Sequence, residues 1–192
     1  MEDKRYNQTH NKINIKIFIN SNKKLRNSYV KLITMWKKYQ IKSWFDSIPV
    51  VLRKYLFNFQ INYYVWDKDN FLVQNLDDGT IREGINKTKI IDVHQWLDEL
   101  QGRRTLIHEI GHLIWQRMDK LERKKVTFKI CKEIKKYSWV HDFIVSHYKK
   151  EFIFSKKYFE EYYAIKLSVD TLGIKKYINS LDKEIKIRKN HG

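Results

Sequence analysis

The sequence predicts an α+β fold, with a small mixed sheet in the N-terminal half followed by a mostly helical C-terminal half. Segments with strand-like patterns occupy the chain before about residue 97, and segments with helical periodicity follow almost without interruption. One proline and six glycines in 192 residues leave few interruptions for helices. This length and a 42% hydrophobic content predict one domain over residues 1–192, with residues 1–44 as a possible N-terminal extension packed on it.

The first elements are expected to be a strand and two helices. Isoleucines alternate with other residues over 13–19, the period of a half-buried strand. Apolar residues at helical spacing then predict a helix over 25–40. Ser47 and Pro49 are typical of a second helix start, with the serine as N-cap and the proline in the first turn. This helix is expected to continue to Tyr55.

The rest of the chain divides into short strands and then long helices. Strands are expected at 61–66, 71–73, 80–86 and 89–93. Helices are expected at 98–119, 126–149, 156–172 and 174–188. Gly173 lies between the last two helices and is expected to cap the first of them.

The run His108-Glu109-Ile110-Gly111-His112 has the pattern H-E-x-x-H, in a helix at the junction of the two halves. Residues i and i+4 lie on one helix face, so His108 and His112 can bind one Zn²⁺ at roughly 2.0–2.1 Å. Glu109 lies close enough to activate a water molecule on the metal. Apolar residues flank the motif, and in a core helix these polar side chains are costly unless a metal neutralises them.

A third ligand is required, because catalytic zinc usually has three protein ligands and one position open for water. One known pattern places a histidine six residues after His112, but Met118 stands there. The downstream candidates are His141, His147, Glu160 and Glu161. The two glutamates are favoured, because carboxylates in an aromatic and otherwise apolar helix need partners.

Only one of the two adjacent glutamates can face the metal, because neighbouring residues on a helix point about 100° apart. The other is expected to face solvent or a nearby lysine, such as Lys156 or Lys157. Acceptors should also orient the free ring nitrogens of the histidines. The possible acceptors are Asp92, Asp98 and Asp170.

The run Glu161-Tyr162-Tyr163-Ala164 resembles the E-[YF]-F-A element of gluzincins related to the anthrax lethal factor catalytic domain, a group that includes the clostridial Pro-Pro endopeptidases. The H-E-I-G-H run is similar to theirs, as is the upstream order of a proline-started helix and a strand. The resemblance covers roughly residues 45–172. It implies a zincin-like fold and makes Glu161, which opens the element, the third zinc ligand.

The same resemblance implies a tyrosine that stabilises the oxyanion, seven residues before the third ligand. Phe154 occupies that position here and has no hydroxyl group. Tyr148 and Tyr158 lie nearby and are the two candidates for this role. Ile165 stands where the family often has a second glutamate.

The expected function is a zinc-dependent endopeptidase, which hydrolyses peptide bonds through metal-activated water with Glu109 as general base. The run Arg104–His112 also resembles the intracellular ImmA/IrrE-type metallopeptidases, so one alternative is a metalloprotease that acts on a regulatory protein. A DNA-associated metalloprotease and a non-catalytic zinc-binding interaction module are further alternatives. The interaction module is disfavoured because a structural zinc site needs no general base.

The composition bears on partners and location. The formal net charge of +17 favours acidic partners, nucleic acid or anionic surfaces. The lysines are spread along the chain and no nucleic-acid motif accompanies them, so a protein or peptide substrate is the expected partner. The single cysteine, Cys131, excludes an intrachain disulfide. No signal peptide or membrane span is visible, so the expected location is the cytoplasm, with secretion by another route left open.

Overall fold

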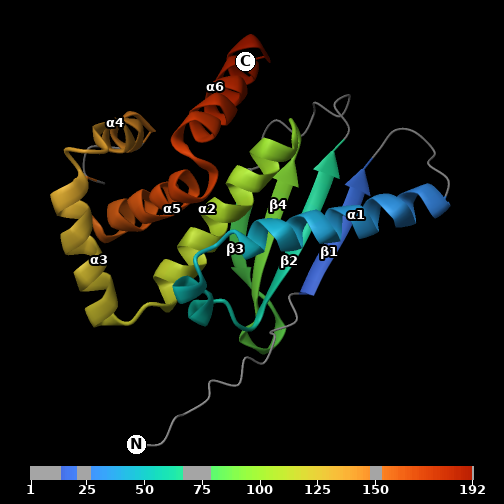
Figure 1. Ribbon diagram of the computed structural model, residues 1–192, viewed down its shortest axis with the longest axis horizontal. Coiled ribbons are helices and arrows are strands. Elements are labelled where there is room, and N and C mark those ends of the chain that lie inside the picture. The colour runs from blue at the N-terminus through green and yellow to red at the C-terminus, as the bar shows by residue number, and fades with distance from the viewer. Residues whose placement is uncertain (1–13, 21–26, 67–78, 148–152, 192) are drawn as a thin grey trace, which may run out of the picture.

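A computed structural model describes residues 14–20, 27–66, 79–147 and 153–191 (Figure 1). The first elements are β1 (Asn14–Asn20), α1 (Asn27–Asp46), the 3-10 helix η1 (Val50–Tyr55), β2 (Phe59–Trp66), β3 (Gly79–Glu83), the 3-10 helix η3 (Ile85–Lys87) and β4 (Lys89–Gln95). The helices α2 (Glu99–Arg117), α3 (Lys120–Glu133), α4 (Ser138–His147), α5 (Lys156–Leu172) and α6 (Ile174–His191) follow. The α+β class is therefore confirmed.

The sheet is mixed, with the strand order β1-β2-β4-β3. β1 and β4 both run parallel to the central strand β2, whereas β3 runs antiparallel to β4 at the edge. Alternate residues of the inner strands face the core, as the period of two requires. Ile61, Tyr63, Ile91 and Val93 are all fully buried. β3 is thus an edge strand among the described residues, with one side not paired to another strand.

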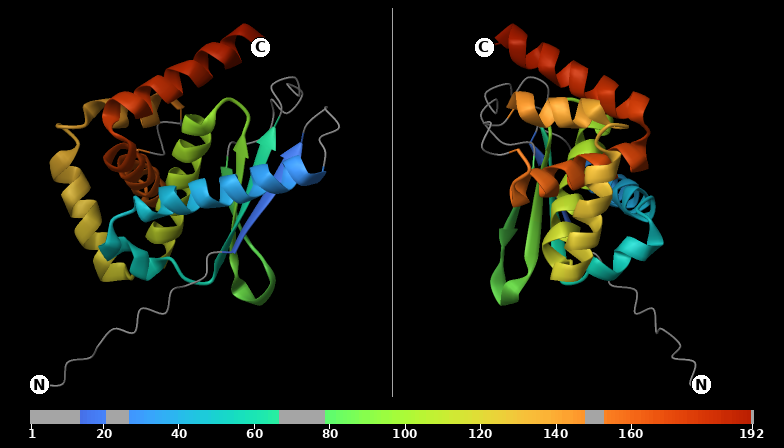
Figure 2. Two further views of the ribbon diagram at one scale, coloured as in Figure 1. Left: turned by 45° about the vertical axis from the view of Figure 1, so that its right-hand side comes forward. Right: turned by 90° about the vertical axis from the view of Figure 1, so that its left-hand side faces the viewer.

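Helices cover the sheet in layers (Figures 1 and 2). α1 packs against β1 and α2, and α2 packs against β3 and β4. α5 lies along α2 and carries α3 and α4 on its outer side, while α6 contacts α2 and α5. Because α2 touches both the sheet and α5, its two faces are both buried, which explains why the segment around the H-E-x-x-H motif is so apolar.

One helix expected from the sequence is wrong: residues 126–149 do not form a single helix. α3 begins earlier, where Asp119 and Glu122 form a capping box, each side chain accepting from the other residue's backbone N–H. Such a reciprocal cap satisfies two backbone donors that a helix start otherwise leaves free. The chain then turns between Glu133 and Ser138 before α4 begins.

The helix start expected at Ser47 also differs. α1 continues to Asp46, and the Ser47 hydroxyl donates a hydrogen bond to the Trp44 carbonyl, so Ser47 closes the preceding helix instead of opening the next. Pro49 itself precedes η1, which is a short 3-10 helix. The strand expected at 71–73 lies outside the described residues. The cap at Gly173 is confirmed, since its φ of +86° favours glycine.

None of the described helices combines the length and the apolar composition needed to cross a membrane.

Candidate metal centre

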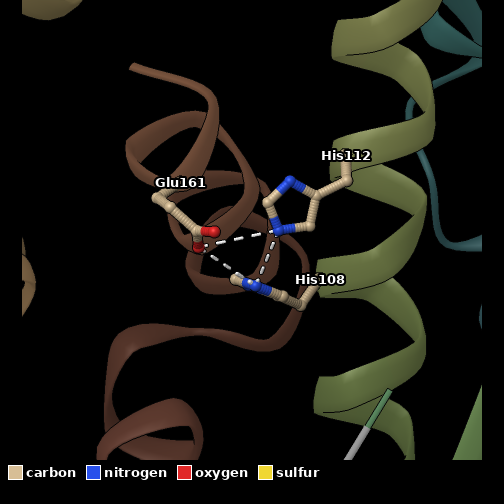
Figure 3. Close-up of side chains that lie close together, drawn as sticks. All are labelled: His108, His112 and Glu161. Carbon is tan, nitrogen blue, oxygen red and sulfur yellow. Dashed lines mark hydrogen bonds and ion pairs between the residues drawn. The ribbon is translucent and has the colours of Figure 1, made fainter. Parts of the chain in front are cut away.

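Helix α2 positions the two histidines of the motif. The Asp98 side chain caps its N-terminus by accepting a hydrogen bond from the Gln101 N–H, which stabilises the start of the helix. His108 and His112 lie one turn apart and turn their rings towards α5 (Figure 3). The ring centroids are 4.7 Å apart, and the two ring planes are nearly perpendicular. Both rings thus present one nitrogen to the same space.

A contact between two small residues allows α5 to approach the histidines. A Cβ atom added to Gly111 would lie 2.7 Å from the Cα and 3.0 Å from the Cβ of Ala164. Gly111 stands inside the H-E-I-G-H run, and Ala164 stands one turn after Glu161 on α5. The absence of a side chain at Gly111 therefore lets the two helices approach closely beside the motif.

Three side chains converge at this point of approach (Figure 3). The Nε2 atoms of His108 and His112 are 3.1 Å apart. Glu161 Oε2 lies 3.5 Å from His108 Nε2 and 3.6 Å from His112 Nε2. All three side chains are partly shielded, with 25%, 14% and 11% of their surfaces exposed in the order His108, His112 and Glu161.

The three ligand atoms fit a single metal ion. Zinc bound tetrahedrally at 2.0–2.1 Å separates neighbouring ligand atoms by about 3.3–3.4 Å. The three observed separations lie on either side of this value. Two imidazoles and one carboxylate also form a ligand set known from catalytic zinc sites. His108, His112 and Glu161 could therefore hold one ion, and the role of Glu161 as third ligand stays a prediction.

The charges of the cluster are strongly coupled. Burial disfavours a charged His112, but hydrogen bonds to Glu160 and Glu161 outweigh it and raise the pKa of His112 to about 10. Burial likewise opposes ionisation of Glu161, yet hydrogen bonds to His108 and His112 hold the pKa of its carboxyl well below the usual range. In the absence of metal, a proton on His112 thus compensates the carboxylate charges beside it.

Glu160 differs from its expected position. Its Oε1 atom lies 3.3 Å from Nδ1 of His112 and accepts a hydrogen bond from the Gln116 side chain at 3.1 Å. In a neutral His112 ring, a hydrogen bond from Nδ1 to Glu160 would fix the tautomer and leave the Nε2 lone pair free for a metal ion. Glu160 therefore contacts a histidine of the cluster. The adjacent carboxylates are the sequence signal for this contact, but the sequence does not show that the second one meets a histidine on another helix.

The three aspartates considered as acceptors for the histidine rings have other contacts. Asp92 bonds to Asn62 and Arg82 on the sheet. Asp98 caps α2 and pairs with Lys183, and Asp170 pairs with Lys166. Glu160 contacts His112 instead.

Glu109 lies on α2 between the two histidines and faces the edge strand. A Cβ atom added to Gly79, the first residue of β3, would lie 2.7 Å from Cγ and 2.9 Å from Oε1 of Glu109. The carboxylate thus rests against the backbone of β3, and only 8% of the residue is exposed. Nothing in the sequence indicates that a side chain of α2 approaches Gly79.

The tyrosines proposed for oxyanion stabilisation have different outcomes. The Tyr158 side chain is fully buried, and its hydroxyl lies 2.8 Å from Nδ1 of His141 on α4. It therefore pairs outside the cluster, and its catalytic role stays a prediction. Tyr148 lies outside the described residues. Phe154 has a φ of +59° and is 58% exposed, so this aromatic ring stands at the surface just before α5.

The arrangement combines side chains that could hold a metal ion, a neighbouring carboxylate and, within the described residues, a strand edge that pairs with no further strand. His108, His112 and Glu161 converge from two helices. Glu109, which is next to His108 on α2, lies against β3. Such a set can hold an ion, exchange a proton and align an extended chain. No protein-family model, curated protein or solved structure matches this chain.

Proposed function

We propose that this protein is a zinc-dependent endopeptidase with a zincin-like fold. The convergence of His108, His112 and Glu161 from two helices carries this proposal, because the separations of their ligand atoms suit one tetrahedral ion. His108, His112 and Glu161 would hold the zinc, which when bound supplies a Lewis acid that polarises a carbonyl group and makes water more acidic.

Glu109 would be the general base of the reaction. Its carboxylate accepts a proton from the attacking water and then donates that proton to the leaving amine. The close contact with Gly79 restricts the carboxylate to the space between α2 and the edge strand. A substrate carbonyl held beside β3 would then lie within reach of both the base and the metal ligands.

The substrate would be an extended peptide that adds to β3. An edge strand offers unpaired backbone N–H and C=O groups, and a peptide in extended conformation can bond to them as a further strand. Glu160 would orient His112 through Nδ1, so that Nε2 remains a ligand atom. Hydrogen bonding along β3 positions the scissile bond without requiring a particular side chain at each substrate position.

The test combines metal analysis with a peptide-library cleavage assay, with and without chelator. The purified chain should contain about one zinc per molecule, and chelator should abolish cleavage. A Glu109→Gln variant should keep the zinc and lose turnover, whereas a Glu161→Ala variant should lose both. Lys157→Ala, an exposed change on α5, is the matched control.

Several results would contradict the proposal. Cleavage at the wild-type rate by Glu109→Gln would show that Glu109 is not the general base. Stoichiometric iron in place of zinc would indicate a different chemistry for the same ligand set. Full zinc content without any cleavage would favour the zinc-stabilised interaction module.

A further inference from the structure

Helix α1 exposes an apolar stripe that the proposed active site does not use. Leu32, Met35, Trp36 and Tyr39 follow the spacing i, i+3, i+4, i+7, so they form one row along the helix. They are 62%, 62%, 52% and 76% exposed in this order. Isolated exposed apolar residues are common, but four large ones in a single row are a feature that requires an explanation.

The stripe lies opposite the side of α1 that packs on the protein. Lys37, Ile41 and Trp44 face inward and are 5%, 0% and 6% exposed. Lys37 is held there by hydrogen bonds to Glu99 and Gln95 at 2.9 and 3.2 Å. α1 thus packs on the protein through the face that carries Lys37, Ile41 and Trp44. The exposed row lies on the other face and points away from the core.

A row of lysines runs beside the stripe. Lys31, Lys38 and Lys42 are exposed and lie at the spacing i, i+7, i+11, which places them on one flank. Between residues 31 and 46 the only acidic residue is Asp46, which lies near Arg53 at the end of the helix. This flank is therefore purely cationic, in a chain with a net charge of +17.

We infer that α1 is an interfacial helix that binds the surface of an anionic phospholipid bilayer. Helices that lie in such surfaces combine an apolar face containing tryptophan and leucine with lysines beside it. Trp36 and Tyr39 belong to the residues that prefer the headgroup level, and the lysine row complements the lipid charge. The proposal is independent of the peptidase function.

The position of α1 fits a broad, flat partner. α1 crosses the outside of the molecule, and η1 lies on the same side of the molecule as α1 (Figures 1 and 2). Val50 and Val51 of η1 are 68% and 72% exposed, so apolar surface continues beyond the end of α1. A single helix on the outside can lie flat on a lipid surface without a matching groove.

The experiment measures binding of the full chain to vesicles at about 0.15 M salt, where nonspecific charge attraction is screened. One vesicle preparation is pure phosphatidylcholine and the other contains about 30% phosphatidylglycerol. The wild-type chain should sediment with the anionic vesicles only. The double variant Leu32→Ser/Trp36→Ser should reduce the partition coefficient by at least about tenfold, because two anchors lose their apolar contact.

The matched control is Leu121→Ser/Phe128→Ser on α3. These residues are 60% and 62% exposed and are also surrounded by lysines, but they lie on a different helix. This control should bind within about twofold of the wild type. An equal loss of vesicle binding in both double variants would overturn the inference, and so would a wild-type chain that does not bind the anionic vesicles. Circular dichroism and thermal denaturation verify that each variant is folded.

A second measurement leaves the stripe otherwise intact. In a Cys131→Ser background, an environment-sensitive dye is attached to Tyr39→Cys or, as control, to Phe128→Cys. Anionic vesicles should shift the emission of the first dye to the blue and leave the second unchanged. A concentration-dependent dimer that Leu32→Ser/Trp36→Ser abolishes, without any dye shift on vesicles, would assign the stripe to a second copy of the chain and contradict the bilayer.

Discussion

The imidazole of His112 has a glutamate on each side. Glu161 faces Nε2 at 3.6 Å and Glu160 faces Nδ1 at 3.3 Å. These two carboxylates are adjacent in sequence yet have different roles in the proposed centre. One would bind the metal, and the other would orient the ring that binds it.

At the scale of single residues, replacement of Glu160 separates these roles. Glu160→Gln should weaken zinc binding by about 10–100-fold, because outer-shell partners of histidine ligands typically have effects of this size. Glu161→Gln should abolish stoichiometric zinc. Competition titration with a zinc indicator measures both affinities. Equal affinities for Glu160→Gln and the wild type would show that the Nδ1 contact does not orient the ring.

Zinc binding should also release a proton from His112. Hydrogen bonds to Glu160 and Glu161 raise the pKa of the metal-free ring to about 10 in spite of its burial, so the ring is charged at neutral pH. Since zinc needs the neutral imidazole, its apparent affinity should rise as the pH increases towards about 10. Calorimetry in two buffers of different ionisation enthalpy counts the protons released.

The same shift has a consequence for stability with a definite sign. A raised pKa means that the folded metal-free protein binds the His112 proton more tightly than the unfolded chain does. The stabilisation is complete below the ordinary pKa of 6.5 and is lost as the pH rises through about 10. If zinc binding at neutral pH releases no proton, His112 is not charged in the metal-free protein. That result would contradict this account.

At the scale of elements, the packing of α2 on α5 depends on Gly111. Gly111→Ala places a Cβ atom 2.7 Å from the backbone of Ala164, which cannot rotate away. Overpacking of this kind costs about 1–3 kcal/mol, partly offset by about 1 kcal/mol of better helix propensity. We therefore expect a net loss of up to about 2 kcal/mol and a weaker zinc site, measured by denaturant unfolding and zinc titration.

Ala164→Gly is the matched comparison for this contact. It weakens α5 through lower helix propensity, by about 1 kcal/mol, but adds no atom between the helices. Zinc affinity should therefore stay near that of the wild type. A Gly111→Ala protein with unchanged zinc affinity would show that the close approach is not what brings Glu161 to the histidines.

At the scale of the whole molecule, zinc would join the helix that lies on the sheet to the outer helical layer. α2 contacts β3 and β4, whereas Glu161 comes from α5, which carries α3 and α4. A ligand that binds only the folded state stabilises it by about 2.7 kcal/mol at 100 times its Kd. For a chain of this size that corresponds to a Tm increase of about 5–10 °C.

Chelator should therefore lower the Tm of the zinc-loaded wild type by this amount. A His108→Ala variant, which lacks one ligand, should melt at the same temperature with and without chelator. Differential scanning calorimetry measures both proteins. A wild-type chain that contains stoichiometric zinc and melts identically in chelator would show that the ion does not connect the two layers.

The sequence by itself determined the local features of this protein. The alternation in β1, the i, i+4 histidines on α2 and the cap at Gly173 could all be read directly, because periodicity and backbone preference act over a few residues. Apolar periodicity over 126–149 did not predict the early start of α3, which the capping box at Asp119 sets, or the turn between Glu133 and Ser138 that separates α3 from α4.

Only the tertiary structure decided which side chains meet. The approach of Glu161 to both histidines depends on the contact of Gly111 with Ala164, and the place of Glu109 depends on Gly79 at the sheet edge. The orienting contact of Glu160 likewise arises from how α5 lies along α2. These contacts join residues far apart in the chain, and local preferences contain no information about how closely two helices or a helix and a strand will pack.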